Sequence, residues 1–433
     1  MQVRIFAYKK LPFQRQLTSA YEKTLEMKAL HKKENRPKYM RQNWKDRLVL
    51  LREANNNAAW AISEYIDNSP RAITSDLIRE ADPEGILPEE AMYAALMAGL
   101  CGIAPSSNDT QETGYAHNSH LDQDSEASET STDSAAYTAK PDAMKDDKPD
   151  ATKNDKPDAT KDENNDGTDL NEYFRFSVRR LDSDTFTSNP YFENIHFPEI
   201  TYKGWRLTHY TYAPYEAFIC NDLITESSLM EIPPVGYFRK PYTYPAIEQE
   251  GREWMAVKPS EIASMQPHID IAAGDIVTFG LGLGYYTFMA ASKPEVRSVT
   301  IVERDRDVIS LFEKILLPQF PCKEKITVVH EDAFNYMERE IVGNKRDFNY
   351  AFVDLWHDNS DGLELYLRSK KYEKEAKSNG NECKFSYWVE HFLLSALRWQ
   401  LFDRIVGTCT SEAQALQMLS DQGLLALIDA SSH

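Results

Sequence analysis

The sequence predicts an α/β protein: a parallel sheet with helices on both faces, preceded by a small β-rich subdomain and a helical N-terminal region. Three observations support this fold class. Apolar residues recur at helical spacing before residue 100, alternate with polar residues between 189 and 257, and form short continuous runs separated by helical segments from residue 275 onward. The predicted parts are 1–104, 105–169, 170–270 and 271–433.

The first part, 1–104, is predicted to be helical. Apolar residues keep helical spacing over 44–53 and 58–66, Thr74 or Ser75 is a suitable N-cap, and Pro88 suits a first turn. The first 60 residues hold fourteen Lys or Arg against five Asp or Glu, which suggests RNA binding. A solvated helix face explains the same excess, and we favour it because few aromatic residues lie among the cations.

The second part, 105–169, is predicted to be a disordered acidic linker. It holds six Lys and seventeen Asp or Glu, and three octads (KPDAMKDD, KPDATKND, KPDATKDE) follow one another from Lys140. Almost no large apolar side chain is present, so burial cannot offset the entropy lost on ordering. We assign this linker no chemistry.

The third part, 170–270, is predicted to be β-rich. A turn at 203–204 precedes the alternating run 205–212, and a turn at 250–251 separates two further runs. The many aromatic residues here are explained more simply as core and cross-strand pairs than as a ligand cage.

The fourth part, 271–433, is predicted to hold the parallel sheet. Its four strands are expected at 276–279, 298–302, 326–329 and 348–353, with an amphipathic helix at 307–317. After the fourth strand we expect helices at 363–372 and 385–402 and no clear fifth to seventh strand, so the sheet is either truncated or completed from elsewhere in the chain. Ligands of such sheets bind beyond the carboxyl ends of the strands, where the polar residues discussed below stand.

A glycine-rich loop follows the first of these strands. Gly280, Gly282 and Gly284 let the backbone approach a ligand and let the next helix present its amides. A dinucleotide fingerprint needs Gly or Ala at 285, where this chain has Tyr285, so a nicotinamide-dependent oxidoreductase is disfavoured. The spacing G-x-G-x-G is that of the nucleoside loop of S-adenosylmethionine (AdoMet) enzymes.

Two acidic residues stand at the ends of the next two predicted strands, at the same edge of the sheet as this loop. Glu303 ends the second strand 23 residues after Gly280, where a carboxylate can bind both ribose hydroxyls. Asp332 follows the third strand, where a carboxylate can accept a hydrogen bond from an adenine amino group. Either acid alone would be an ordinary loop residue, and the coincidence of loop and acids favours an AdoMet site.

Residues 254–358 resemble class I AdoMet-dependent methyltransferases, and most of all their spermidine-synthase-like branch, which also carries β structure ahead of its nucleotide-binding fold. The resemblance implies a Rossmann-like sheet and AdoMet as the cofactor. The stretch 254–261 is similar to the lead-in of that branch. The roles that the resemblance implies are motif I for Gly280, Gly282 and Gly284, ribose binding for Glu303, a frame for the adenine for Asp332 and Ala333, and a place beside the sulfonium and the acceptor for Asp354.

Two positions depart from the patterns of these families. Many methyltransferases have an acid two residues before the first glycine, where this chain has Thr278, which implies an indirect contact to the methionine amine. Aminopropyltransferases typically have G-G-G-D-G-G, and the residue that matches the Asp is Leu283. Polyamine synthesis is therefore disfavoured.

The function predicted from these residues is methyl transfer by in-line displacement, in which the protein mainly positions the reactants. Asp354, His357 and Asp358 are the candidate bases, and their acidity suits a small or cationic acceptor. His357 could instead cap the next helix, and Trp356 could stack on an acceptor or simply pack. The alternatives are a non-catalytic AdoMet-binding or interaction protein, aminopropyl transfer, and an RNA-modifying enzyme, although no Asn-Pro-Pro-Tyr motif follows the fourth strand.

Composition narrows the class of protein further. The formal charge of −19 is unfavourable for a general nucleic-acid binder, and the five Cys are scattered without a C-x-x-C pair. This predicts a reducing compartment and neither a disulfide framework nor a zinc site. We see no signal peptide, and the longest uncharged run, 91–108, is too short and too polar to span a membrane, so a cytoplasmic protein is expected.

Overall fold

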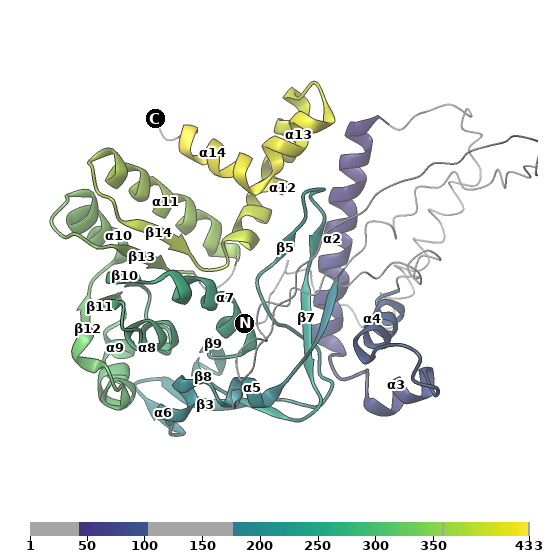
Figure 1. Ribbon diagram of the computed structural model, residues 1–433, viewed down its shortest axis with the longest axis horizontal. Helices are drawn as coiled ribbons and strands as arrows, with labels where there is room; N and C mark the ends of the chain where they lie inside the picture. The colour runs from purple at the N-terminus through teal and green to yellow at the C-terminus, as the bar shows by residue number, and fades with distance from the viewer. Residues whose placement is uncertain (1–42, 103–175, 357–358, 432–433) are drawn as a thin grey trace, which may run out of the picture. The chain divides into compact units, whose positions relative to one another are not determined.

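A computed structural model describes residues 43–102, 176–356 and 359–431 (Figure 1). The predicted linker with its octads, most of the basic N-terminal stretch, and the candidate bases His357 and Asp358 lie outside these described residues. Among the helices of the described ranges, none has both the length and the apolar composition needed to cross a membrane.

The centre of the fold is a five-stranded parallel sheet. Its strands are β10 Gly274–Phe279, β11 Val296–Glu303, β12 Ile326–His330, β13 Tyr350–Val353 and β14 Lys384–Tyr387. They lie in the order β12-β11-β10-β13-β14, and all neighbours pair in parallel. The chain therefore starts in the middle, runs to one edge, and then crosses to the other, which is the doubly wound, Rossmann-like arrangement. The predicted fold class is confirmed.

Helices cover both faces of this sheet. Because the crossovers are right-handed, the reversal of direction after β12 places the helices before β12 and the helices after it on opposite faces. α8 (Tyr285–Ala291) and α9 (Arg306–Leu311) lie on one face, and α10 (Ala333–Tyr336) and α11 (Asn359–Ser378) on the other (Figure 1). The helix expected at 307–317 is α9 continued by a π-helical turn, Phe312–Leu316.

The sequence prediction was wrong at the fifth strand. The helix expected at 385–402 does not begin at residue 385, because residues 384–387 form β14, which pairs with β13 from Lys384 to Tyr387. The helix α12 starts only at Glu390, after Val389 adopts a left-handed conformation with φ 45°. A long apolar stretch cannot reveal this division, because the strand is fixed by pairing with a distant neighbour and not by local periodicity.

The β-rich segment precedes the sheet, as predicted. β2 (Ile200–Tyr202), β3 (Trp205–Tyr212), β8 (Tyr242–Gln249) and β9 (Arg252–Ala256) form an antiparallel sheet in that order. Lys203 and Gly204 make the first predicted turn and Glu250 and Gly251 the second, and all four have positive φ, as tight hairpin turns require. Shorter strands complete the segment: β1 (Ser177–Leu181), β4 (Phe218–Ile219), β5 (Ile224–Thr225), β6 (Glu231–Ile232) and β7 (Pro234–Phe238).

The remaining helices lie at the two ends of the chain. α2 (Trp44–Asn68), α3 (Ser75–Ala81) and α4 (Glu89–Leu100) come first, and Thr74 is the N-cap of α3, accepting from the Leu77 amide at 3.2 Å. α2 buries Leu48 and Leu51 in the same apolar core as the parallel sheet. α12 (Glu390–Thr408), α13 (Glu412–Leu419) and α14 (Asp421–Ser431) end the described chain. The short helices α5 (Ser183–Thr187) and α6 (Pro190–Asn194) lie between β1 and β2.

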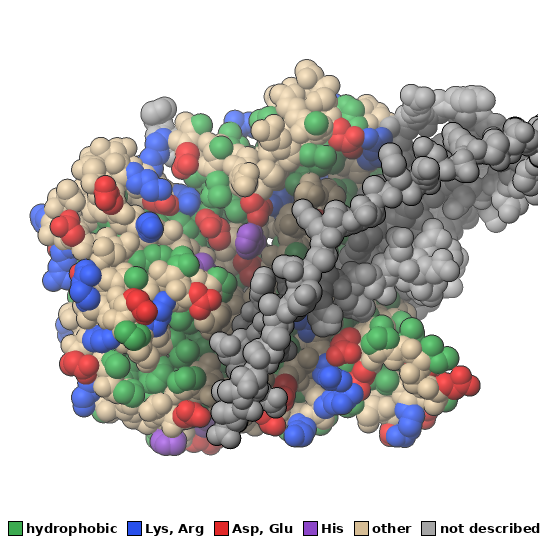
Figure 2. Space-filling view, viewed as in Figure 1, with side chains coloured by type: hydrophobic (Ala, Val, Ile, Leu, Met, Phe, Trp, Pro, Cys, Tyr) green, Lys and Arg blue, Asp and Glu red, His purple; other side chains and the backbone are tan. Residues whose placement is uncertain are grey.

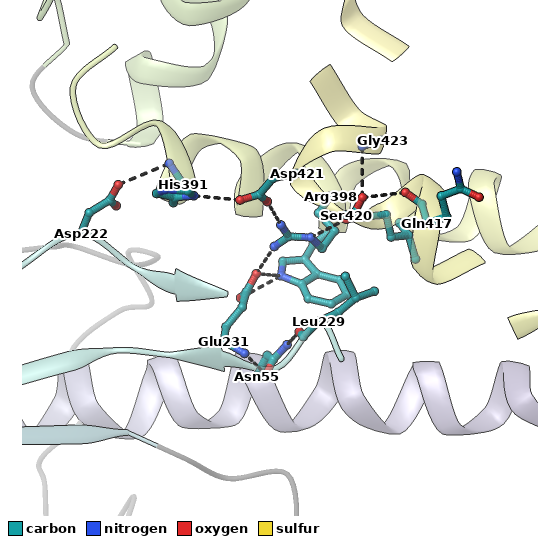
Figure 3. A network of polar contacts seen from close by, with 12 residues as sticks. Asn55, Asp222, Leu229, Glu231, His391, Arg398, Gln417, Ser420, Asp421 and Gly423 are labelled. Atoms are coloured by element: carbon teal, nitrogen blue, oxygen red, sulfur yellow. Dashed lines mark hydrogen bonds and ion pairs between the residues drawn. The ribbon is translucent and has the colours of Figure 1, made fainter. Parts of the chain in front are cut away.

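A buried polar network joins these two ends (Figure 3). Arg398 of α12 is fully buried and binds Glu231 of β6 and Asp421 of α14. The Glu231 carboxylate also accepts from Trp399, and its backbone amide donates to the buried side chain of Asn55 on α2 at 3.1 Å. The network therefore ties α2, a strand and the C-terminal helices together through groups that are largely buried.

Charged side chains are interspersed on the surface. On the face shown in Figure 2, Lys and Arg alternate with Asp and Glu over the described residues. This is the pattern of an ordinary solvated surface.

Candidate functional site

A small cavity lies where β10 and β13 end. Its volume is about 90 Å³, and it is bounded by the glycine loop, by β9, by the start of α7 (Pro259–Ile271) and by the segment after β13. A cavity of about 150 Å³ holds one benzene molecule, so this space is smaller than a nucleoside. The cavity can therefore take the reacting end of a ligand and not a whole nucleoside.

The glycine loop is shaped by its contacts with the sheet. Gly280 has φ 99°, and a Cβ there would stand 2.0 Å from the carbonyl oxygen of Asp354, so only glycine allows β10 and β13 to end side by side. Gly284 has φ 78°, and a Cβ there would stand 2.7 Å from the Phe312 ring. At Gly282, by contrast, an added Cβ meets nothing within 4 Å, so the loop is open at its middle glycine. All three predicted glycines thus lie in one turn before α8.

Glu303 lies at the end of β11 and holds the glycine loop. Its carboxylate accepts from the amide of Leu281 at 3.3 Å and from the amide of Asp305 at 2.8 Å. Burial raises the pKa of Glu303 above its ordinary value, although these amides oppose the shift. Because each carboxylate oxygen has two lone pairs, both can still accept from a ligand hydroxyl.

Asp332 and Ala333 lie at the end of β12, next to Glu303. The Glu331 amide donates to the Glu303 carbonyl at 3.0 Å, which fixes the two strand ends together. Asp332 is the N-cap of α10, and one of its oxygens accepts from the amides of Phe334 and Asn335. Its second oxygen makes no hydrogen bond among the described residues, and Ala333 is buried beneath it in the first turn.

Asp354 lines the cavity directly after β13. Its backbone amide donates to the Phe279 carbonyl at 2.9 Å, which sets the residue beside the glycine loop. Burial raises the pKa of Asp354 well above its ordinary value, and the nearby charges of Glu261 and Glu303 raise it further. In the described part of the chain, no cation pairs with this carboxylate.

Glu261 is the residue of the site that sequence reasoning did not find. It stands in the first turn of α7 and lines the same cavity as Asp354 and Glu253 of β9. Burial raises the pKa of Glu261, and the neighbouring Lys258 opposes that shift. Lys258, 4% exposed, donates to Glu253 at 2.9 Å. The sequence of 254–261 resembles the segment that precedes the nucleotide-binding fold in the spermidine-synthase-like branch. It does not reveal that Glu261 is buried, because that burial depends on how α7 packs against the sheet.

Aromatic side chains line much of the cavity. Trp254, Tyr286, Trp356 and Trp388 line it, and the Trp388 indole donates to Ser264 at 2.8 Å. The Tyr286 hydroxyl and the Trp356 indole nitrogen are buried, and neither has a hydrogen-bond partner among the described residues. Buried polar atoms without partners are rare, and a bound ligand, water or ion is one explanation for them.

Tyr285 explains why the dinucleotide pattern is absent. Its ring packs edge-on against Tyr191 of α6 with centroids 5.3 Å apart, and its hydroxyl accepts from Asn189 at 2.9 Å. A glycine at this position would leave room for close packing of helix and strand. Here the Tyr285 side chain occupies that room and links α8 to the β-rich segment.

Comparisons with known proteins find only partial structural similarity. No family model matches the chain, and no curated protein sequence matches it. Spermidine synthase from Thermotoga maritima, and a spermidine synthase in complex with the transition-state analogue AdoDATO, each match 36% of this chain and 58% of their own at 14% identity and TM-score 0.24. MNMC2 from Aquifex aeolicus matches 32% of this chain and 60% of its own at 13% identity and TM-score 0.21.

The chain thus spans less than two thirds of each of these proteins. At such identities and TM-scores the matches carry no conclusion about activity. The assignment of a Rossmann-like fold rests on the strand order of the parallel sheet.

Proposed function

We propose that this chain is an AdoMet-dependent methyltransferase that acts on a small amine. The observation that supports it most is the buried carboxylate of Asp354, which pairs with no cation among the described residues and lines the cavity beside the glycine loop together with Glu261. Three acids, Glu253, Glu261 and Asp354, line this cavity, and only Glu253 pairs with a lysine, Lys258, among the described residues, so a cation entering the cavity would be stabilised.

The residues present fit the cofactor. Gly282 leaves the loop open to a ligand, Glu303 would bind the ribose hydroxyls, and Asp332 with Ala333 would frame the adenine at the next strand end. AdoMet, when bound, supplies an electrophilic methyl group. The nucleoside would have to lie along the open strand ends, since the cavity itself has only about 90 Å³.

Asp354 would act on the acceptor. An amine is nucleophilic only after it has lost its proton, and a carboxylate whose pKa is raised by burial is a better base than an exposed one. The aromatic side chains around the cavity would keep water from the reacting atoms and favour an ammonium group over their ring faces.

Aminopropyl transfer is the less favoured reaction. Leu283 lines the cavity with an apolar side chain that is 4% exposed, and it offers no charge to an additional amine. A binding protein without turnover would show the same small cavity, and only the detection of a methylated product separates it from an enzyme.

Calorimetry with the purified protein tests the proposal. AdoMet and its demethylated product should bind and NAD should not, and ligand at 100-fold over its dissociation constant should add about 2.7 kcal/mol to the stability of the folded state. Glu303→Gln should weaken binding, whereas the exposed Glu295→Gln, at the opposite end of β11, should not. Absence of heat with both AdoMet and its product would refute the proposal. Transfer of a labelled methyl group to small amines then tests turnover.

A further inference from the structure

Glu261 is a second carboxylate of the cavity with which no cation pairs among the described residues. The nearest lysine in the sequence, Lys258, is bound to Glu253 at 2.9 Å. The Glu261 carboxylate makes neither a hydrogen bond nor an ion pair in the described part of the chain, and its side chain is only partly buried, so a ligand can reach it. A carboxylate in such a place is stabilised by a cation that arrives with a ligand.

The position of Glu261 is fixed by contacts between α7 and the end of β13. Its backbone carbonyl accepts from the Ser264 hydroxyl at 3.3 Å, and the Ser264 oxygen accepts from the Trp388 indole at 2.8 Å. The Trp388 amide in turn donates to the carbonyl of Val353, the last residue of β13, at 3.0 Å. Asp354 follows directly, so Glu261 and Asp354 line the same space from two different elements.

The glycine loop itself offers no charge to this space. Thr278, two residues before Gly280, uses its hydroxyl proton on the Gly280 carbonyl at 3.3 Å. Leu281 and Leu283 line the cavity with apolar side chains. A ligand cation that lies over the loop must therefore find a carboxylate on another wall of the cavity, and Glu261 of α7 is one that no described lysine occupies.

We infer that Glu261 binds the ammonium group at the methionine end of AdoMet, and that Asp354 is left to the acceptor. This inference rests on the proposed function. AdoMet, when bound, carries two cationic groups, the sulfonium and this ammonium, and the acceptor amine adds a third. The two carboxylates are near enough that the charge of Glu261 raises the pKa of Asp354, so a cation that neutralises one of them also stabilises the charged form of the other. The cavity would thus hold the amine of the cofactor and the amine of the acceptor at separate carboxylates.

The carboxylate of the methionine end has no comparable partner. Among the described residues that line the cavity, none is Lys or Arg. Recognition of this end should therefore depend on the amine and not on the carboxylate.

Calorimetric titration with three nucleosides tests the assignment of Glu261. The demethylated product carries both the amine and the carboxylate, decarboxylated AdoMet carries the amine without the carboxylate, and 5′-methylthioadenosine carries neither. Glu261→Gln should weaken binding of the first two about 10- to 100-fold, because a hydrogen bond to a charged group is lost, and should leave 5′-methylthioadenosine unchanged within about twofold.

Glu303→Gln and Glu295→Gln are the matched controls. Glu303→Gln should weaken binding of all three nucleosides alike, because they share the ribose, and the exposed Glu295→Gln should change none of them. The melting temperature without ligand shows whether each variant folds. If Glu261→Gln does not fold, Glu261→Asp, which keeps the charge on a shorter side chain, replaces it and should weaken the two amine-bearing nucleosides selectively.

The possible results separate this inference from the proposed function. A loss of affinity that is equal for all three nucleosides, or no loss for the demethylated product, overturns the role of Glu261 and leaves the methyltransferase standing. A loss confined to the demethylated product would mean that the carboxylate is recognised, and it also overturns the role of Glu261. If the wild type binds none of the three nucleosides, the methyltransferase itself is refuted.

Discussion

The Asp354 side chain reduces the stability of the fold when it is charged, and it is well placed for a chemical role. Burial at the end of a strand destabilises the charged form of this carboxyl group, and the charges of Glu261 and Glu303 add to that, which is why its pKa is raised. Such a group is more often kept for a reaction than for stability.

Asp354→Asn keeps the shape of this side chain and removes its charge. We expect turnover to fall by about 10²–10⁴-fold, the usual range for a positioned base, while AdoMet affinity changes little because other strand ends bind the nucleoside. Steady-state kinetics and calorimetry measure the two effects. Asp347→Asn, at an exposed position three residues before β13, is the control. An unchanged rate would transfer the role to His357 or Asp358, or show that the acceptor arrives deprotonated.

His391 gives a prediction of pH dependence. Its ring nitrogen bonds Asp421 at 2.8 Å, and this bond, opposed by partial burial, raises the pKa of His391 above its ordinary value, with Asp222 and Glu390 adding to the rise (Figure 3). A raised pKa means that the stabilisation is complete below the unfolded value near 6.5 and is lost as pH rises through the folded value. The difference in melting temperature between the wild type and His391→Gln should therefore shrink from pH 6 to pH 9. A constant difference would contradict this.

The residues of the site differ in how far sequence could predict them. Gly280, Glu303, Asp332 and Asp354 follow strands whose apolar runs are legible, so their convergence at one edge of the sheet follows from topology. Glu261 could not be found this way, because it lies on a helix and its burial results from tertiary packing. The roles of the predicted residues stay predictions.

At the scale of elements, the buried network shows what holds the C-terminal helices in place. Arg398 binds Glu231 at 2.5 Å and also contacts Asp421, and all its charge is compensated by these neighbours. No sequence pattern predicts such a contact, because its partners lie 167 and 23 residues away. β14 was missed for the same reason.

Arg398→Met removes the cation and leaves Glu231 buried without it. We expect a loss of about 3–5 kcal/mol in the free energy of unfolding, the usual cost of breaking a buried pair. Arg79→Met removes an exposed arginine that pairs with Asp76 within one helix, and it should change stability by less than about 1 kcal/mol. Urea unfolding compares the two. A similar small effect in both variants would mean that the network is dispensable.

At the scale of the whole molecule, the segment with the octads separates α4 from β1 in the sequence. Nevertheless α2, which precedes this segment, packs into the same apolar core as the parallel sheet, which follows it. Deletion of residues 110–165 should leave the melting temperature and AdoMet affinity unchanged, since we expect no burial from that composition. Differential scanning calorimetry and titration of AdoMet check this. Loss of folding or binding would show that the segment is structural.

The contacts of α2 also constrain how the protein is made. Arg47 of α2 pairs with Glu412 of α13, 365 residues later in the chain. At a synthesis rate of about 5–20 residues per second, the ribosome would deliver the partner roughly 20–70 s after the helix. The core residues that follow α2, from Tyr191 to Ile428, are largely synthesised during this interval, so the apolar face with Leu48 and Leu51 is not fully buried until they are made. We therefore expect chaperones that bind nascent chains to bind this helix. We also expect folding of the molecule to be completed only after α13 has been synthesised.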